Sequence, residues 1–324
     1  DRTMDLTAEI ERTHERIAPS IRRTPLFEVA PADFGLQADF RLFLKLELFQ
    51  RSGSFKARGA AANLALRTIP AAGVAAASGG NHGAAVADAA APRGIPTTIF
   101  VPEISDPAKT RRIAETGAHL VVEGARYADA LEKCLDHCAR TGAVNIHAYD
   151  QHETILGQAT LGREIDLAMR ADGLKLDQIL VAVGGGGLIS GVSAWFRDNA
   201  SVTGVEPENA SALNAALAAN SLVDVDVSGI AADSLGARRI GTLNYEILRD
   251  NAVTAVTVTD ADIQAAQSQL WHTHRILAEP GGVTSLAALT SGQIRPEPGS
   301  RVCAIICGGN VDAVNLGPAP PAGP

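Results

Sequence analysis

The sequence has few cysteines and no excess of basic residues, and each shortage excludes a class of protein. Only 4 of its 324 residues are cysteine, too few for the disulfide framework of a small secreted domain. Acidic residues outnumber basic ones, 36 against 28, and the net charge is -8, which is unlike a nucleic-acid-binding surface with its clustered Lys and Arg. We therefore expect a protein that acts on small molecules in a reducing cytoplasm, with no nucleic-acid partner.

Long uncharged runs are also scarce. The run at 179–196 has no charged residue, but four consecutive glycines, Gly184 to Gly187, stand in its middle. Such glycines suit a buried strand, a turn and a helix start better than a membrane helix. The first residues, 1–5, lead into a charged amphipathic stretch without the apolar core of a signal peptide. We therefore expect no membrane association.

What the sequence does contain indicates an α/β protein. Hydrophobic residues make up 46% and charged residues 20% of the chain, a composition that can build a sizeable core. Short runs rich in β-branched residues alternate with helical patterns, which is typical of open, mostly parallel sheets with helices on both faces. The expected strands are 74–77, 97–101, 120–122, 179–183, 201–205, 253–258 and 302–306. The expected helices are 83–91, 107–116, 127–141, 154–171 and 260–275. The Pro- and Gly-rich tail, 317–324, is predicted to be disordered.

Two short segments carry most of the information about chemistry. The first is Ser-Phe-Lys-Ala-Arg-Gly at 54–59, and the second is Ser-Gly-Gly-Asn-His-Gly at 78–83. A lysine amine becomes nucleophilic when burial or a nearby cation lowers its pKa, and it then forms Schiff bases with carbonyl compounds such as pyridoxal phosphate, PLP. Lys56 is our candidate for this amine. Taken alone, Lys56 is better interpreted as an ordinary exposed helix lysine, and only its combination with the second segment reverses this interpretation.

Together the two segments resemble the serine/threonine dehydratase family of PLP-dependent enzymes, which have fold type II, the tryptophan synthase β-like fold. In that family the lysine segment reads Ser-Phe-Lys-x-Arg-Gly and the substrate loop reads Ser-x-Gly-Asn-His. The resemblance implies that Lys56 binds PLP and acts as the catalytic base. It also implies a large PLP-binding domain of residues 1–72 and 151–324, with a small domain, 73–150, inserted into it.

The glycine run after the strand at 179–183 is the expected phosphate site. A Gly-rich turn at a helix start offers several convergent N–H donors, and the resemblance assigns cofactor binding to Gly184, Gly185, Gly186, Gly187 and Leu188. Two alternatives stay open at this point. The glycines could serve only close packing, or they could belong to a nicotinamide-dinucleotide fingerprint, with Glu206 near the distance expected for a ribose contact.

Further site residues follow from the resemblance. It assigns the substrate carboxylate to the loop of Ser78, Gly79, Asn81 and His82. The remaining cofactor contacts that it implies are Phe55, Asn81, Glu279 and Cys307, although Phe55 could equally fill the core. Cys307 would lie against the pyridine nitrogen, where a thiol keeps the ring a weaker electron sink than a carboxylate would.

Several residues depart from the family pattern. Racemases of the group carry a serine at the position of Gly79, which has no side chain to deliver a proton. Ala212 stands where some relatives have an aspartate ligand of a divalent cation, so we predict no metal site there. Ser234 replaces a glycine near the substrate, and Tyr149 replaces a Phe or Asn near the cofactor. These last two changes leave the substrate open.

The resulting prediction is a PLP-dependent ammonia-lyase that acts on a β-hydroxy amino acid such as threonine or serine. The alternatives are an amino-acid racemase or a β-replacement enzyme of the same fold, a nicotinamide-dependent oxidoreductase, and a binding module without catalysis. The resemblance implies a homo-oligomer, either a dimer or a tetramer. Because the sequence stops soon after its last expected strand, we expect no C-terminal regulatory domain. Cys134, His137 and Cys138 fit an ordinary helix face rather than a metal site.

Overall fold

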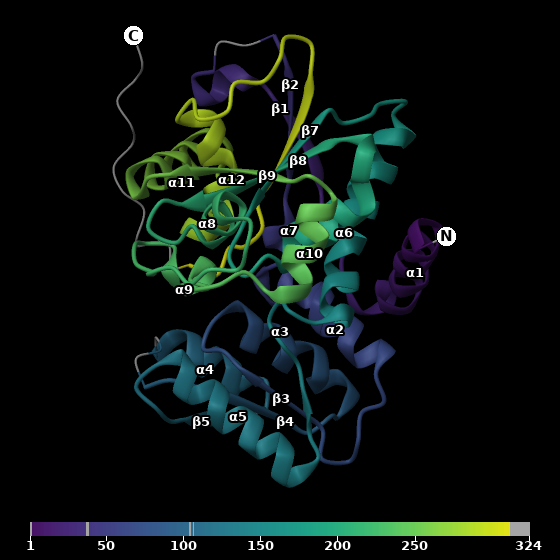
Figure 1. Ribbon diagram of the computed structural model, residues 1–324, viewed down its shortest axis with the longest axis vertical. Coiled ribbons are helices and arrows are strands. Elements are labelled where there is room, and N and C mark those ends of the chain that lie inside the picture. The colour runs from purple at the N-terminus through teal and green to yellow at the C-terminus, as the bar shows by residue number, and fades with distance from the viewer. Residues whose placement is uncertain (1, 37–38, 104, 106, 312–324) are drawn as a thin grey trace.

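The computed structural model of the protein describes residues 2–36, 39–103, 105 and 107–311. Two β-sheets, both flanked by helices, form the fold (Figure 1). Seven of the eight strand pairings within these sheets are parallel, and the remaining pairing, β1 with β2, is antiparallel. The predicted α/β class is therefore confirmed. The tail at 317–324, predicted to be disordered, lies outside the described residues.

The larger sheet has six strands in the order β1-β2-β10-β7-β8-β9. Its strands are β1 (Leu26–Val29), β2 (Arg41–Lys45), β7 (Gln178–Ala182), β8 (Ser201–Pro207), β9 (Thr254–Val258) and β10 (Arg301–Ile305). The central strands β7 and β10 are nearly continuous apolar runs, as expected for parallel strands that are covered on both faces. The principal hydrophobic core surrounds them.

Two pairs of helices cover the larger sheet. Helix α7 (Gly187–Phe196) packs on β7 and β8, and α6 (His152–Ala171) packs against α7. Helix α12 (Pro280–Thr290) packs on β7, β8, β9 and β10, and α11 (Asp260–His274) packs against α12. In Figure 1 the two pairs lie on opposite sides of the strands.

The smaller sheet has four parallel strands in the order β5-β4-β3-β6. Its strands are β3 (Val74–Ala77), β4 (Thr97–Val101), β5 (His119–Val122) and β6 (Val144–Asn145). Helix α5 (Tyr127–Thr141) packs on β3, β4 and β6, while α3 (Asn81–Ala90) and α4 (Pro107–Glu115) pack together and contact β3, β4 and β5. This part of the chain forms the lower half of Figure 1. The exact domain boundaries at 72/73 and 150/151 stay a prediction.

The remaining helices are α1 (Arg2–Ile17), α2 (Lys56–Leu66), α8 (Ala212–Ala219), α9 (Ala232–Leu235) and α10 (Thr242–Asp250). Helix α2 packs against α6 and α3. It therefore links the larger sheet's helices with the first helix of the smaller sheet. Because Lys56 is the first residue of α2, the position of this helix decides where the amine lies.

Glycines allow α2, α6 and α7 to approach closely. A Cβ at Gly157 of α6 would come within 2.5 Å of the Arg58 carbonyl oxygen and 2.7 Å of the Gly59 Cα. A Cβ at Gly191 of α7 would come within 2.5 Å of the Ala159 nitrogen. Backbone atoms occupy these places, so a side chain would force the helices apart. Helix α6 thus sets the separation between the helix that begins at Lys56 and the helix that follows the glycine run.

No helix within the described parts of the chain is both long and apolar enough to cross a membrane. The uncharged run at 179–196 contains strand β7, a glycine turn and helix α7, as the sequence predicts.

Candidate active site

The topology brings the predicted site residues to one edge of the larger sheet. Strands β7 and β10 are parallel neighbours, so their carboxyl ends lie side by side. The run Gly184 to Gly187 follows β7, and Cys307 follows β10 by two residues. Ligand sites of open α/β sheets gather at such carboxyl ends. Phe55 joins this edge because its backbone N–H donates to the Cys307 carbonyl oxygen at 3.0 Å.

Lys56 is a partly exposed lysine in largely apolar surroundings. Its Nζ donates to the Ala148 carbonyl oxygen at 2.7 Å and lies 5.1 Å from the centre of the Phe55 ring. Burial lowers the pKa of Lys56 to about 8, against a weak opposite influence of Cys307. At mildly alkaline pH a substantial fraction of this amine is therefore neutral, which is the form that acts as a nucleophile or base. Phe55 flanks the amine and also packs against the core.

Cys307 presents a neutral thiol. The side chain is 3% exposed, and Sγ donates to the Gly281 carbonyl oxygen at 3.6 Å. Burial, assisted by the nearby Glu279 carboxylate, raises the pKa of this thiol far above its ordinary value. Cys307 therefore cannot supply a negative charge at physiological pH.

The glycine run forms a cradle at the start of α7. Gly186 is the residue before the helix and has a φ of 96°, a left-handed conformation that favours glycine. The first N–H groups of a helix have no acceptor within it, and no side chain caps α7. The cradle is held from outside, because the Gly185 carbonyl accepts hydrogen bonds of 3.1 Å from the Gly241 N–H and from Asn244 Nδ2. This start of a helix suits an anion.

Asn81 connects the two sheets. Its Nδ2 donates to Glu279 Oε1 at 2.6 Å, and its Oδ1 accepts from Asn310 Nδ2 at 2.8 Å. Asn310 also donates to the Ser52 carbonyl at 2.8 Å, and the Glu279 N–H donates to the Gly308 carbonyl at 3.1 Å. The start of α3 is thereby joined to the start of α12 and to the segment after β10.

The predicted substrate loop follows β3 and leads into α3. Ser78 Oγ accepts from the Gly80 N–H at 3.2 Å, and no side chain caps the start of α3. His82 is buried, and its Nε2 lies 2.8 Å from the Ile146 carbonyl oxygen, so Nε2 carries the proton. Burial, with help from Lys56, lowers the pKa of His82 to about 3. A neutral His82 leaves the helix start itself as the anion-binding feature.

Gly79 of the same loop lies close to Ser105. A Cβ at Gly79 would collide with Ser105 Oγ.

Sequence reasoning missed the segment between β6 and α6. It supplies the carbonyls of Ile146 and Ala148 to His82 and Lys56. The Tyr149 ring lies against Gly185, where a Cβ would fall among the ring atoms. The Asp150 carboxylate accepts from the first N–H groups of α10, Thr242 and Leu243, at 3.0 and 2.9 Å. Every residue has a carbonyl group, so the sequence does not indicate these contacts, and it draws attention to this segment only through Tyr149.

A buried cluster of four charges lies beneath Lys56. Arg58 contacts Glu47 through Nε at 2.5 Å and Glu164 through Nη2 at 3.0 Å, and Lys45 Nζ contacts Glu164 at 2.6 Å. Thr24 adds a hydrogen bond of 2.6 Å to Glu47. Burial would raise the pKa of Glu164, but Arg58 and Lys45 hold it below its ordinary value. The cluster has no net formal charge, and it ties α2 to α6 and β2 beside the catalytic candidate.

Glu206 forms hydrogen bonds with the start of a helix. Its carboxylate accepts from the Leu213 and Asn214 N–H groups at 2.7 and 2.8 Å and from Asn214 Nδ2 at 2.8 Å. It thus caps α8 and is engaged neither as a ribose contact nor as a cation ligand. Among the described residues no group of three or more His, Cys, Asp or Glu side chains could hold a metal ion. Ser234 lies beside Gly281, where a Cβ would collide with its Oγ.

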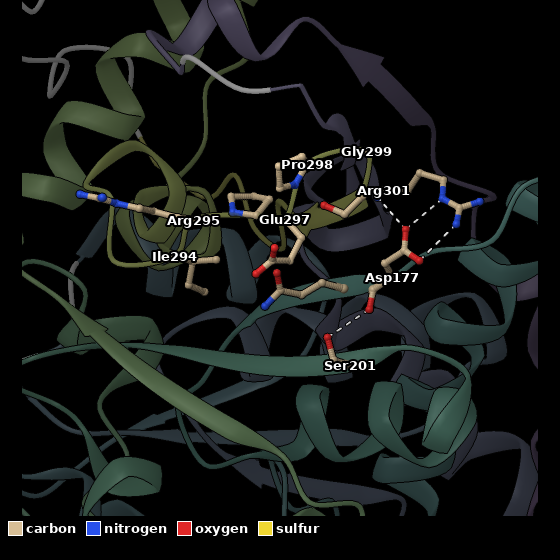
Figure 2. Close-up of a pocket in the computed structure, with 11 residues that line it drawn as sticks. Asp177, Ser201, Ile294, Arg295, Glu297, Pro298, Gly299 and Arg301 are labelled. Carbon is tan, nitrogen blue, oxygen red and sulfur yellow. Dashed lines mark hydrogen bonds and ion pairs between the residues drawn. The ribbon is translucent and has the colours of Figure 1, made fainter.

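A hollow of about 550 Å³ opens at the opposite edge of the larger sheet (Figure 2). It lies at the amino ends of β7, β8 and β10, near Gln178, Ser201 and Arg301. A bidentate ion pair between Arg301 and Asp177, with distances of 2.9 and 3.1 Å, borders it. None of the predicted site residues lines this hollow, so it is separate from the candidate active site.

Comparison with known proteins identifies the family. The model of the family described as pyridoxal-phosphate dependent enzyme matches residues 17–308. A biosynthetic L-threonine dehydratase of Mycobacterium tuberculosis is 36% identical over 322 residues, which cover 96% of this chain and 73% of the relative. A phenylserine dehydratase of Ralstonia pickettii is 34% identical over 319 residues, which cover 96% of this chain and 95% of the relative.

A solved structure shows the same fold. Maize serine racemase superposes with a TM-score of 0.88 at 31% identity, and the match covers 95% of this chain and 94% of that one. The similar proteins thus include dehydratases and a racemase. They share the fold and differ in the reaction that their names describe.

Proposed function

Because the chain belongs to the family of pyridoxal-phosphate-dependent enzymes, in its serine/threonine dehydratase-like group of fold type II, we propose that it is an ammonia-lyase for a β-hydroxy amino acid. The products would be a 2-keto acid and ammonia, with threonine or serine as the substrate. PLP is the cofactor of this family, so the nicotinamide alternative is wrong. The roles of individual residues given below are part of the proposal.

The residues at the carboxyl ends of β7 and β10 fit PLP. An uncapped helix start behind Gly184 to Gly187 suits the phosphate, the Lys56 amine suits the aldehyde, and Cys307 suits a pyridine nitrogen that is not protonated. Asn244 Oδ1, beside the cradle, is a buried oxygen without a hydrogen-bond partner. It is therefore an acceptor that a bound group could use. When bound, PLP withdraws electrons from the substrate Cα and so acidifies its proton.

The observation that carries the proposal is the state of Lys56. Its amine has a pKa near 8 and donates one N–H to the Ala148 carbonyl at 2.7 Å. A neutral amine held in this way has its lone pair directed away from that carbonyl. Lys56, once its amine is free, would therefore accept the Cα proton as a general base.

The substrate carboxylate would bind at the start of α3. The N–H groups of Asn81, His82 and Gly83 precede the first helical hydrogen bond, and the positive end of the helix dipole favours an anion there. Because His82 is neutral, this recognition would depend on backbone groups and on Ser78. A bound carboxylate fixes the Cα proton on the side of Lys56.

Two residues favour elimination over racemisation. The neutral thiol of Cys307 would leave the PLP ring only a modest electron sink. A modest sink favours prompt loss of the β-hydroxyl over a long-lived negative charge at Cα. Gly79 has no side chain that could return a proton to the opposite face. The hydroxyl would leave as water with a proton from the bound phosphate or a nearby group, and the resulting enamine would hydrolyse to the keto acid and ammonia.

A racemase is the second candidate, and one observation favours it. Ser105 Oγ occupies the space into which a side chain at Gly79 would project. A hydroxyl therefore lies next to the position that carries serine in racemases of this group.

Product analysis decides between the two reactions. The purified holoenzyme should convert L-threonine to 2-oxobutyrate and L-serine to pyruvate, each with one equivalent of ammonia. L-phenylserine is included because of the Ralstonia relative. Chiral chromatography of the serine reaction should detect little D-serine. If D-serine forms faster than pyruvate and Ser105→Ala abolishes its formation, the protein is a racemase and the dehydratase proposal fails.

A further inference from the structure

His147 lies beside Lys56 but has no role in the proposed mechanism. It belongs to the segment that leads from β6 to α6, and its side chain is only partly exposed. Its own backbone N–H donates to Gln151 Oε1 at 3.0 Å. Its ring meets the Tyr149 ring edge to face, with the centres 4.8 Å apart.

The hydrogen bonds of His147 define its protonation state. Nδ1 lies 3.2 Å from the Tyr149 backbone nitrogen and 2.9 Å from the Asp150 backbone nitrogen. Both are N–H donors, so Nδ1 must accept and the ring proton is assigned to Nε2. The imidazole is therefore neutral in this arrangement.

One peptide group connects His147 with Lys56. The N–H of Tyr149 and the C=O of Ala148 belong to the same peptide bond, and this unit is planar. Its N–H donates to His147 Nδ1 at 3.2 Å, and its C=O accepts from Lys56 Nζ at 2.7 Å. The two groups lie in one rigid plane and point in opposite directions. An acceptor that fixes the direction of the N–H therefore also fixes the direction of the carbonyl.

The charged groups around His147 are consistent with a neutral ring. Burial and the Lys56 ammonium lower the pKa of His147, and the Asp150 carboxylate opposes them. His82, the other imidazole nearby, is also neutral at physiological pH. Nδ1 is thus available as an acceptor under the conditions in which Lys56 would work.

We propose that His147 is a positioning residue for Lys56. By holding the peptide between Ala148 and Tyr149, it keeps the Ala148 carbonyl directed at Nζ, and so keeps the lone pair of the amine directed toward the cofactor aldehyde and the substrate. This inference rests on the proposed role of Lys56. It does not depend on whether the reaction is an elimination or a racemisation.

Three substitutions separate this role from general packing. In His147→Asn the amide oxygen can take the place of Nδ1 and accept the same N–H groups. His147→Leu retains bulk but has no acceptor, and His147→Gln carries its acceptor one bond too far from the backbone. The thermal midpoint of each apoenzyme, with its far-ultraviolet circular dichroism, shows whether the variant folds.

The first measurement is the rate at which apoenzyme captures PLP. Stopped-flow absorbance follows the capture, and borohydride reduction with mass spectrometry verifies that the adduct is on Lys56. We expect the Leu and Gln variants to be slower than the parent by about tenfold or more, and the Asn variant to remain within about threefold. Capture by a folded Leu or Gln variant at the parent rate would overturn the proposal. If the Leu variant does not fold, the Gln and Asn variants still decide.

The second measurement uses substrate. With α-deuterated L-threonine, the isotope effect on kcat/KM should increase in the Leu and Gln variants and remain at the parent value in the Asn variant, with little change in KM. An unchanged isotope effect together with a raised KM would show a role in binding and would contradict the proposal. If the parent turns over neither threonine nor serine, the proposed function fails, while PLP capture still tests His147.

Discussion

At the scale of single residues, the environment of Lys56 separates it from the other lysines. Replacing Lys56 by Ala should leave a folded protein that retains no PLP after borohydride treatment and dialysis, because the covalent link is lost. Turnover should fall by about a thousandfold or more, because the base is lost as well. Mass spectrometry of the reduced parent should place PLP on Lys56. Lys175→Ala, at an exposed position, is the control and should be neutral. An adduct on another lysine of the parent would contradict the assignment.

Cys307 offers a second test at this scale. An Asp at 307 would place a carboxylate where the thiol is 3% exposed and would keep the pyridine nitrogen protonated. We expect elimination to slow by about tenfold to a thousandfold, since each ~1.4 kcal/mol added to the barrier costs a factor of ten. Cys307→Ser, neutral and of similar size, should retain most activity. Steady-state kcat with threonine compares the three proteins, and equal kcat in the Asp variant would mean that Cys307 does not contact the ring.

The residue scale also shows what the sequence could and could not predict. Lys56, Asn81 and the glycine run could be proposed as site residues from the sequence, because their side chains, or the lack of them, are suited to binding PLP. The carbonyl of Ala148 was not, since every residue has one and only the fold aims it at Nζ. Asn310 follows Cys307 closely in the sequence, yet its contact with Asn81, at 2.8 Å, depends on the pairing of two distant segments. The catalytic and binding roles of these residues remain predictions.

At the scale of elements, the buried charges hold the helix that begins at Lys56. Arg58→Met should destabilise the protein by about 3–5 kcal/mol, because Glu47 and Glu164 would be left buried with too few partners. The matched control is Arg41→Met, which breaks an exposed pair with Glu28 at 2.7 Å and should cost at most about 1 kcal/mol. Urea unfolding of the holoenzymes at pH 7 gives both values. Equal losses would show that burial does not distinguish the two pairs.

The close approach of α2 and α6 is a second property of elements. Gly157→Ala would introduce a Cβ within 2.5 Å of the Arg58 carbonyl oxygen, and overpacking of this kind costs about 1–3 kcal/mol. The affinity for PLP should fall as well, because α2 carries Lys56. In Gly162→Ala the nearest atom is the Trp195 Cβ at 3.1 Å, which has to move by only a few tenths of an ångström, so a smaller loss is expected. Urea unfolding and PLP titration measure the two effects. A variant at 157 with parental stability and affinity would mean that the helices adjust freely.

Most elements were predictable from periodicity, and their ends were less so. Helix α5 has the predicted bounds, Tyr127–Thr141, while α3 begins at Asn81, two residues before the predicted start. The difference has a physical cause: the two added residues, Asn81 and His82, are polar and so lie outside the apolar pattern, yet they form the first turn of the helix. Strands β1 and β2, which pair with each other on the β10 side of the larger sheet, were not predicted as strands. Strand β1 has only one buried side chain and no clear alternation, and β2 is a short run with a charged residue at each end, Arg41 and Lys45.

At the scale of the whole molecule, Glu206 makes stability depend on pH. Burial raises its pKa to about 7 from an ordinary value of 4.5, although the N–H groups of Asn214 and Leu213 act in the opposite direction. The folded protein therefore binds this proton more tightly than the unfolded chain does. The associated stability is fully present below pH 4.5 and is lost as the pH rises to about 7.

Glu206→Gln removes this titration. The slope of the unfolding free energy against pH should become flatter in that window, by up to about 1.4 kcal/mol per pH unit. Glu208→Gln, at an exposed position, is the control and should keep the parental slope. Urea unfolding at a series of pH values measures all three proteins. A parental slope in the Glu206 variant would mean that the α8 donors keep the carboxylate ionised throughout.

The assembly of the molecule is a further property at this scale. The resemblance to its family predicts a dimer or a tetramer, and this stays a prediction because a single chain does not reveal its partners. The topology itself was predictable in outline, since alternating strands and helices permit few arrangements. What composition could not provide is the return of the first strands to the larger sheet, which depended on the resemblance.

The charge cluster of Lys45, Glu47, Arg58 and Glu164 has a consequence for evolution. Its charges cancel only as a set, so loss of one member leaves an excess charge that the interior cannot solvate. A compensating change at a second member would restore neutrality. Related sequences should therefore exchange these four positions jointly, in pairs of opposite sign, or retain all of them. Neutral drift would be slow here even though none of the four side chains takes part in the reaction.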